Sequence, residues 1–369
     1  MKIAGFDIGG ANTDLAIVDF DEETHEIKNI ATDFEYLPMW SNKEDLGDAL
    51  LNLIQKTLDA DGGVGTSSVG SVGASDGGIN SLDAIGISMT AELVDAYETK
   101  KKGVLDIANK SKEIFDNKLS KNIPLLFIGT NNVLSFEKLK ENPSEIAAAN
   151  WIATSKIAAK ISINSIFIDT GSTTTDIIPV KNGKECAKGR SDYERLSTDE
   201  LVYTGTLRTN LASFLDNIQF NDNQFNVASE LFAITADVYN VLGKITEDDY
   251  VCHTCDGAGK SKEESARRIS RVLCADLDTL SFEDIVEISK YIHKKQVQQI
   301  AKSLDKVSKE ENLDLVITTG LGKDILAKEA AKSLNLKTKS MTELLTDEEC
   351  VVAPAIGTAI MVEEYLNNV

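Results

Sequence analysis

The strongest constraint on the fold of this 369-residue chain is a hairpin pattern that occurs twice. GFDIGGANTDLAIV, which starts at Gly5, and IFIDTGSTTTDIIPV, which starts at Ile166, share the pattern D-x-G-x-x-x-T-D between two apolar runs. Apolar runs on both sides of a short glycine-containing turn predict a β-hairpin. Self-similarity at one large spacing, rather than at several short periods, predicts two related lobes and not a solenoid.

Each copy places an Asp at the end of an apolar strand, just before a turn rich in Gly, Ser, Thr and Asn. A partly desolvated carboxylate is costly unless a metal or hydrogen-bond donors compensate it, so we expect a divalent metal between Asp7 and Asp169. Glycines let backbone N–H groups converge on an anion, and polar side chains add donors. The predicted phosphate-binding residues of the turns are Gly9, Gly10, Asn12, Thr13, Gly171, Ser172, Thr173 and Thr174. The alternative is a pair of hairpins whose Asp and Gly serve only the turn, and two matching copies favour phosphate binding.

A third glycine loop follows the apolar run LDLVITT and precedes a helical segment. It contains Gly320 and Gly322, and a strand, a Gly loop and a helix in this order can offer a helix N-terminus to a phosphate or nucleoside. The loop is not a Walker motif. Together with the two hairpins and Gly357 near the C-terminus, it completes a set of candidate nucleotide- or phosphate-binding elements.

Strands and helices alternate along the chain, which predicts layered α/β architecture, and the length favours two lobes over one core. We expect a first lobe over residues 1–145 plus 354–369 and a second over 146–353. Residues 61–80 are rich in Gly and Ser and are expected to be a flexible, dispensable insertion, with a functional lid as the alternative. The expected strands are 2–8, 14–20, 82–88, 124–128, 165–169 and 313–318, and the expected helices are 44–58, 144–160, 228–242, 262–275, 282–308, 323–334 and 354–366.

Charge and composition exclude several classes of partner. The formal net charge of -21 and the pI of about 4.6 would repel nucleic acid and anionic membranes. No run of 18 apolar residues suggests a membrane span, and the N-terminus lacks a signal-peptide pattern, so we expect a cytoplasmic protein. The five cysteines do not form a disulfide framework, and Cys252 and Cys255 supply only half of a four-ligand zinc site. His25, His253 and His293 are isolated, which favours structural roles.

The hairpins, the Gly320 loop and the Gly357 turn resemble the two phosphate motifs, the adenosine motif and the connecting motif of the acetate/sugar kinase, heat-shock and actin superfamily. The resemblance implies a duplicated two-lobed actin-like, or ribonuclease H-like, α/β fold with a ligand cleft between the lobes. GFDIGGANTD and SMTAELVDAY (from Ser88) are similar to the hydantoinase/oxoprolinase branch.

Four further segments resemble a narrower family, found in archaea and methylotrophs and linked to tetrahydromethanopterin one-carbon metabolism. They are ANWIATSK from Ala149, SDYERLSTDELVYTGTLRTN from Ser191, ELFAITADVYNVLG from Glu230 and DGAGKSKEESARRISRVLCAD from Asp256. The characterised activity of that family is a synthase of methanofuran biosynthesis. The resemblance covers nearly the whole chain apart from the Gly/Ser-rich insertion.

This resemblance implies a transferase that condenses an aminomethyl-furanmethanol diphosphate with γ-glutamyltyramine to form an aryl ether and diphosphate. It implies Mg2+ or another divalent cation, and the activated ester makes ATP consumption unnecessary. The predicted substrate-binding residues are Glu200, Tyr203, Arg208, Asp256 and Arg268. For the arginines on segment 262–275, a solvated helix face is the alternative. A core position fits Tyr203 as well as substrate binding does, and an ordinary surface position fits Glu200 as well. Homo-oligomer formation is left open.

The phenol needs a general base, because its unperturbed pKa is near 10. Glu92, Asp95 and Asp176 are the candidates, and the sequence does not rank them. Asp7, Asp169, Asp176 and Glu92 are the predicted catalytic residues. Two other functions remain open at this point: an ATP-dependent small-molecule kinase or lactam-cleaving hydrolase of the same fold, and a non-catalytic, actin-like nucleotide-binding scaffold.

Overall fold

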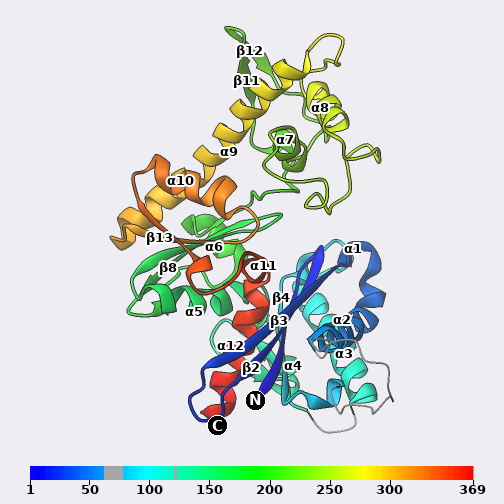
Figure 1. Ribbon diagram of the computed structural model, residues 1–369, viewed down its shortest axis with the longest axis vertical. Helices are drawn as coiled ribbons and strands as arrows, with labels where there is room; N and C mark the ends of the chain where they lie inside the picture. Colours follow the sequence, from blue (N-terminus) through cyan, green and yellow to red (C-terminus); the bar gives the residue numbers. More distant parts are fainter. Residues whose placement is uncertain (62–77, 120–122, 369) are drawn as a thin grey trace, which may run out of the picture. The chain divides into compact units, whose positions relative to one another are not determined.

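The computed structural model describes residues 1–61, 78–119 and 123–368, which form two compact units (Figure 1). Unit 1 comprises Met1–Lys160 and Leu345–Val369, and unit 2 comprises Ile161–Leu344. The sequence prediction places the boundaries after residue 145 and before residue 354. In the division into compact units, helix α5 (Asn150–Ile161) falls almost wholly within unit 1, and α11 (Asp347–Val351) falls within it. Of the insertion expected at 61–80, residues 62–77 lie outside the described part of the chain.

Unit 1 is built on a six-stranded sheet with the order β3-β2-β1-β4-β5-β6. Its strands are β1 (Lys2–Ile8), β2 (Asn12–Phe20), β3 (Ile27–Tyr36), β4 (Ala84–Met89), β5 (Leu125–Ile128) and β6 (Val133–Ser135). One face packs against α2 (Leu46–Asp61) and α3 (Lys100–Lys118), and there the rings of Phe6 and Phe115 lie 6.2 Å apart. Successive strand residues face opposite sides, so Gly5 faces away from this core.

Helix α12 (Ala353–Asn367) packs on the face of the sheet that carries Gly5. A Cβ atom at Gly5 would lie 2.2 Å from the carbonyl oxygen of Ala355, so only glycine allows the helix to lie this close. Further along, a Cβ atom at Gly357 would lie 2.4 Å from the carbonyl oxygen of Ala153 in α5. This close packing of α12 on β1 and α5 explains why both helices belong to unit 1.

Unit 2 contains a second sheet with the order β10-β8-β7-β13-β14, with β9 paired to β8. Its strands are β7 (Ser165–Thr170), β8 (Thr175–Lys181), β9 (Lys184–Glu185), β10 (Leu201–Val202), β13 (Leu315–Thr319) and β14 (Lys337–Ser340). Its helices are α6 (Asp192–Thr198), α7 (Thr235–Val241), α8 (Lys262–Arg271), α9 (Phe282–Glu311) and α10 (Lys328–Ser333). Figure 1 shows α9 extending from the sheet to α7, α8 and the hairpin of β11 (Asn217–Phe220) and β12 (Asn223–Asn226).

The strand order β3-β2-β1-β4-β5 in unit 1 corresponds to β10-β8-β7-β13-β14 in unit 2, with the same strand directions, which confirms the duplication predicted from the repeated hairpin. β1 runs antiparallel to β2 and parallel to β4, and β7 runs antiparallel to β8 and parallel to β13. The register is also the same, because Asp7 lies opposite Asp14 in the first hairpin and Asp169 lies opposite Asp176 in the second. The phosphate turns predicted from the sequence therefore occupy equivalent places in the two units.

Several elements differ from the sequence prediction. Strand β3 and the 19-residue helix α3 were not expected. The helix expected over 228–242 is only Thr235–Val241, because Ile234 is extended and forms a β-bridge with Asn210. In the described ranges, no helix combines the length and apolar character needed to cross a bilayer.

Candidate functional site

The first hairpin holds Asp7 at the end of β1, where its side chain is nearly buried. Ser88 Oγ, at the end of the neighbouring strand β4, donates to Asp7 Oδ1 at 2.8 Å. Asn150 Nδ2, in the first turn of α5, donates to Asp7 Oδ2 at 3.1 Å. Thr358 Oγ1 of α12 in turn donates to Ser88 Oγ at 2.9 Å. Three elements of unit 1 thus fix the orientation of one carboxylate.

The turn after Asp7 is closed by a hydrogen bond from the Gly9 amide to the Asn12 carbonyl, at 2.8 Å. The Gly10 carbonyl accepts the Met39 amide at 2.9 Å, and the structure gives the Gly10 and Ala11 amides no acceptor in the described residues. Asn12 Oδ1 is buried without a hydrogen-bond partner among those residues. Thr13, which is fully buried, pairs with Ile8 on the α2–α3 side of the sheet, away from Asp7.

The second turn, Gly171–Thr174, has the same closure, because the Gly171 amide donates to the Thr174 carbonyl at 3.0 Å. The carbonyls of Gly171 and Ser172 accept the amides of Thr206, Leu207 and Arg208 at 2.9–3.0 Å. In a trans peptide the N–H points opposite to the C=O, so the Ser172 and Thr173 amides are directed away from this segment. No acceptor for the amides of residues 172–174 occurs within the described ranges. Such a row of open amides is a concavity suited to an anion.

The Gly320 loop joins this turn. Gly320 has a φ of +83°, and a Cβ atom there would lie 2.4 Å from Asp169 Oδ1. The Gly322 amide donates to the Thr170 carbonyl at 2.8 Å. A Cβ atom at Gly322 would lie 2.4 Å from Thr206 Oγ1, a buried hydroxyl without a partner in the described residues. Unit 2 therefore brings Asp169, the open turn and both predicted glycines of the third loop together.

Two of the predicted substrate-binding residues lie beside this turn. Arg208 Nη1 is 3.4 Å from Thr173 Oγ1, and the Arg208 amide is one of those that hold the Ser172 carbonyl. Tyr203 follows strand β10, whose Val202 pairs with Thr175, and its side chain is 64% exposed. A half-buried cation thus lies beside the open amides of unit 2, and an exposed aromatic residue follows the strand that pairs with Thr175.

Asp176, predicted to be catalytic, forms an ion pair with Arg195, which is almost fully buried. Arg195 Nη2 also donates to Asp192 at 2.7 Å. Burial raises the pKa of Asp176, and the neighbouring guanidinium opposes that rise. Its role as a catalytic base stays a prediction, as does that of the buried Glu92, whose backbone packs against Gly103 of α3. The third candidate base, Asp95, is exposed.

Glu200 is buried inside its own loop. Its two carboxylate oxygens accept the backbone amides of Lys188 and Gly189, at 2.6 and 2.8 Å, and Thr198 Oγ1 at 2.7 Å. Both oxygens thus stabilise the local chain path between β9 and β10. A substrate contact by Glu200 stays a prediction, and its described contacts are structural.

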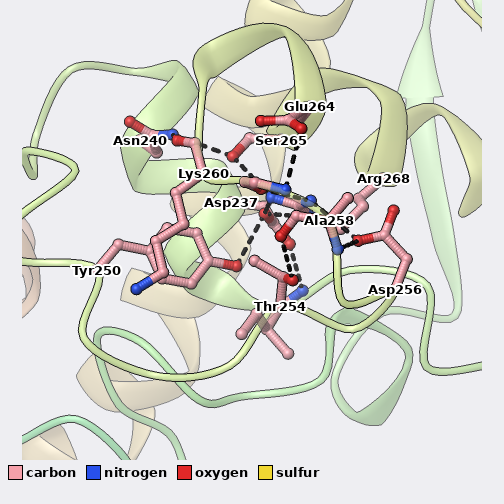
Figure 2. A network of polar contacts seen from close by, with 12 residues as sticks. Asp237, Asn240, Tyr250, Thr254, Asp256, Ala258, Lys260, Glu264, Ser265 and Arg268 are labelled. Atoms are coloured by element: carbon pink, nitrogen blue, oxygen red, sulfur yellow. Dashed lines mark hydrogen bonds and ion pairs between the residues drawn. The ribbon is translucent and has the colours of Figure 1, made fainter.

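Arg268 and Asp256, also predicted to bind substrate, belong to the polar network in Figure 2. Arg268 is fully buried, and its Nε donates to Asp237 Oδ1 at 2.8 Å. Its Nη1 donates to Asp256 Oδ1 at 3.1 Å and to the Gly259 carbonyl at 3.0 Å. Tyr250 Oη donates to Asp237 Oδ1 at 3.0 Å, and burial raises the pKa of Asp237. Arg268 thus ties α8 to α7 and to the 256–259 loop, and direct substrate contact stays a prediction.

The cysteines of the C-x-x-C segment are both reduced. Burial raises the pKa of the Cys252 and Cys255 thiols to about 11, which favours the protonated thiol over the thiolate that binds metal. Among the described residues, no group of three or more His, Cys, Asp or Glu side chains could hold a metal ion. Asp7 lies in unit 1 and Asp169 in unit 2, so a metal shared by the two stays a prediction.

Ser88 and Thr206 are site residues that the sequence prediction missed. Ser88, the second-last residue of β4, pairs with Asp7, and Thr319, the last residue of β13, pairs with Asp169. A hydroxyl residue at the end of each apolar run was the signal available in the sequence. For Thr206 no comparable signal exists, because its position depends on the path of the loop after β10.

Comparison with known proteins supports the architecture. The chain superposes on a nucleotide-free acetone carboxylase with a TM-score of 0.62, covering 97% of this chain and 70% of that one. At 11% identity this likeness shows the fold alone, and the duplicated sheets are those of the two-lobed actin-like α/β fold predicted from the sequence. The hydantoinase/oxoprolinase family matches residues 83–365.

Two archaeal relatives carry the same name, (4-{4-[2-(γ-L-glutamylamino)ethyl]phenoxymethyl}furan-2-yl)methanamine synthase. The protein from Methanocaldococcus jannaschii is 36% identical over 370 residues, which cover 100% of this chain and 99% of that one. The protein from Methanococcus vannielii is 40% identical over 214 residues, which cover 57% of this chain and 96% of that one. The chain therefore belongs to the hydantoinase/oxoprolinase family and, within it, to the family of the Methanocaldococcus jannaschii synthase.

Proposed function

We propose that this protein joins the diphosphate ester of an aminomethyl-furanmethanol to the phenol oxygen of γ-glutamyltyramine. The bond between the furanmethyl carbon and its diphosphate oxygen breaks, and the electron pair leaves with the diphosphate. A new bond forms between that carbon and the phenol oxygen, and the phenol proton passes to a base. The product is the aryl ether that the names of the two archaeal relatives describe.

The observation that carries the proposal is the open turn of unit 2. The Gly171 and Ser172 carbonyls accept hydrogen bonds from the 206–208 segment, and the amides of residues 172–174 have no acceptor in the described part of the chain. Donors fixed in this way stabilise the negative charge that develops on a leaving diphosphate, and they need no reorganisation during the reaction. Arg208, beside Thr173, adds a permanent positive charge.

Furan chemistry fits such a site. The furan ring stabilises positive charge on the attached methylene carbon, so the reaction needs strong assistance to the leaving group and little push from the nucleophile. Positioning and charge stabilisation can supply that assistance without a covalent enzyme intermediate. Tyr203, an exposed aromatic residue that follows the sheet partner of Thr175, is the proposed contact for the aromatic phenol substrate.

The proposal includes a divalent cation, Mg2+ being the first candidate. Mg2+ is commonly held by one or two carboxylates together with substrate phosphates and waters. Asp7 and Asp169 are each the second-last residue of a strand that leads into a predicted phosphate turn. The buried Asn12 Oδ1, which has no partner among the described residues, is a further hard oxygen at the first turn. These residues fit the cation, which when bound would neutralise charge on the diphosphate oxygens.

The test is product formation from the two purified substrates, followed by mass spectrometry. We expect the ether with Mg2+, no ether with a chelator, and unchanged yield when ATP is added, because the ester already contains the energy for C–O bond formation. Asp314→Asn, an exposed substitution in the same unit, serves as the matched control for a variant of Asp169. ADP release in proportion to product would overturn the proposal in favour of an ATP-dependent enzyme.

A further inference from the structure

A buried glutamine in α9 connects this helix to the residues that pack against the Gly171–Thr174 turn. Gln296 is 1% exposed and lies among the apolar residues that α9 turns toward the core. Its Nε2 donates to Thr204 Oγ1 and to the Gly205 carbonyl, each at 2.8 Å, and its Oε1 accepts from Tyr239 Oη at 2.5 Å. Both amide hydrogens and the amide oxygen are therefore satisfied, which fixes the orientation of the side chain.

The residues that Gln296 holds touch the turn directly. A Cβ atom at Gly205 would lie 2.5 Å from the Thr173 nitrogen and 2.6 Å from the Ser172 carbonyl carbon, so this glycine packs against the peptide between them. The Thr204 carbonyl accepts Thr175 Oγ1 at 2.8 Å. Any movement of residues 204 and 205 must therefore move the turn or open a gap behind it.

Tyr239 of α7 secures Gln296 from the other side. Tyr239 is fully buried, and its hydroxyl also lies 3.4 Å from Nδ1 of His293, whose ring meets the tyrosine ring edge-on at 5.7 Å. Burial lowers the pKa of His293 to about 4, so this histidine is neutral at pH 7. The cluster of Gln296, Tyr239 and His293 carries no charge and is held by hydrogen bonds and packing alone.

We propose that Gln296 is a positioning residue that sets the affinity of the Gly171–Thr174 turn for diphosphate without touching the ligand. It holds Thr204 and Gly205 against the Ser172–Thr173 peptide and so keeps the open amides of the turn in place. This inference rests on the proposed function in one respect, namely that the ligand of the turn is a diphosphate.

The first test compares a substitution of Gln296 with a matched control in the same helix. Gln296→Met keeps a similar volume and removes all three hydrogen bonds of the side chain, whereas Gln298→Met changes an exposed residue of the same helix. Calorimetry with Mg2+ and inorganic diphosphate gives the dissociation constant independently of catalysis. We expect binding about 10-fold weaker in Gln296→Met, from the loss of the hydrogen bonds to Thr204 and Gly205, and wild-type binding in Gln298→Met.

Steady-state kinetics separates positioning from general weakening of the fold. The KM for the diphosphate ester should rise in Gln296→Met, while the KM for γ-glutamyltyramine stays at its wild-type value. Tyr239→Phe removes only the hydroxyl that orients Gln296 and should give a smaller shift in the same direction. This second variant carries the test if Gln296→Met fails to fold.

Wild-type diphosphate binding in folded Gln296→Met and Tyr239→Phe proteins would overturn the inference, as would an equal rise in both KM values. Absence of diphosphate binding by the wild-type protein would also overturn it. Diphosphate binding without any ether formation would contradict the proposed function alone, because the binding comparison does not depend on turnover.

Discussion

Gly320, in the loop that contacts the unit 2 turn, is constrained by neighbouring atoms of the chain. Gly320 combines a φ of +83° with a position where a Cβ atom would lie 2.4 Å from Asp169 Oδ1 and 2.5 Å from the Thr170 carbonyl oxygen. Gly183 has a similar φ of +75°, yet its nearest atom would be 3.7 Å away. A comparison of substitutions at the two glycines therefore distinguishes the cost of backbone strain from the effect of pushing on the Asp169 carboxylate.

We predict that Gly320→Ala lowers stability more than Gly183→Ala and raises the KM for the diphosphate ester. Both substitutions place a side chain in the left-handed region, at a cost of about 1–2 kcal/mol. Only Gly320→Ala also pushes on the Asp169 carboxylate. Urea unfolding together with steady-state kinetics measures both effects, and equal losses of stability with an unchanged KM would contradict the prediction.

Asp169 itself should be needed for turnover and not for folding. Asp169→Asn keeps the shape of the side chain and removes its charge, so we predict a loss of ~10²–10³ in kcat with an unchanged melting temperature. The matched control Asp314→Asn should retain wild-type turnover. Full activity and unchanged metal dependence in Asp169→Asn would assign this residue a structural role.

Among the elements, α7 connects most of the polar structure of unit 2. Its first turn holds the 205–209 segment, where Thr235 Oγ1 donates to the Gly205 carbonyl at 3.1 Å and the Ala236 amide donates to the Leu207 carbonyl at 3.0 Å. The same helix carries Asp237, paired with Arg268 of α8, and Tyr239, bonded to α9. A helix of seven residues is thus fixed by polar contacts with both of its helical neighbours.

We predict that Arg268→Met destabilises the fold by about 3–5 kcal/mol, because it leaves the Asp237 carboxylate buried without its counter-charge. Adding Asp237→Asn removes that charge and should restore much of the loss. The measurement is the free energy of unfolding in urea for the wild type, both single variants and the double variant. Additive losses in the double variant would mean that the two side chains do not interact energetically.

His293 gives the α7–α9 contact a pH dependence. Its pKa is lowered by burial to about 4 from an ordinary value of 6.5, so between these values the unfolded chain binds a proton that the folded chain does not. The free energy of unfolding therefore does not depend on His293 protonation above pH 6.5, and it decreases as the pH falls from 6.5 toward 4. We predict that His293→Phe reduces the difference between the unfolding free energies at pH 7 and pH 5. An unchanged difference would contradict this.

At the scale of the whole molecule, the duplicated fold could be predicted because both hairpins repeat a local pattern with one physical meaning. The sequence analysis missed helix α3. This helix contains six lysines and Gly103, which make the helical spacing of its apolar residues Val104, Ile107 and Phe115 difficult to recognise. The sequence also could not reveal that Arg268 and Glu200 are occupied by internal partners, since those contacts depend on tertiary packing. The local chemistry of the turns could be predicted from the sequence, whereas contacts between distant segments could not.

The central claim is that the ether oxygen comes from the phenol and that diphosphate leaves from the furanmethyl carbon. The most direct measurement uses γ-glutamyltyramine labelled with ¹⁸O at the phenol, incubated with the diphosphate ester and Mg2+. The account predicts that the ether keeps the ¹⁸O label and that the released diphosphate contains none. Label in phosphate or diphosphate, with an unlabelled ether, would show that the phenol oxygen was activated and displaced, and would contradict the account.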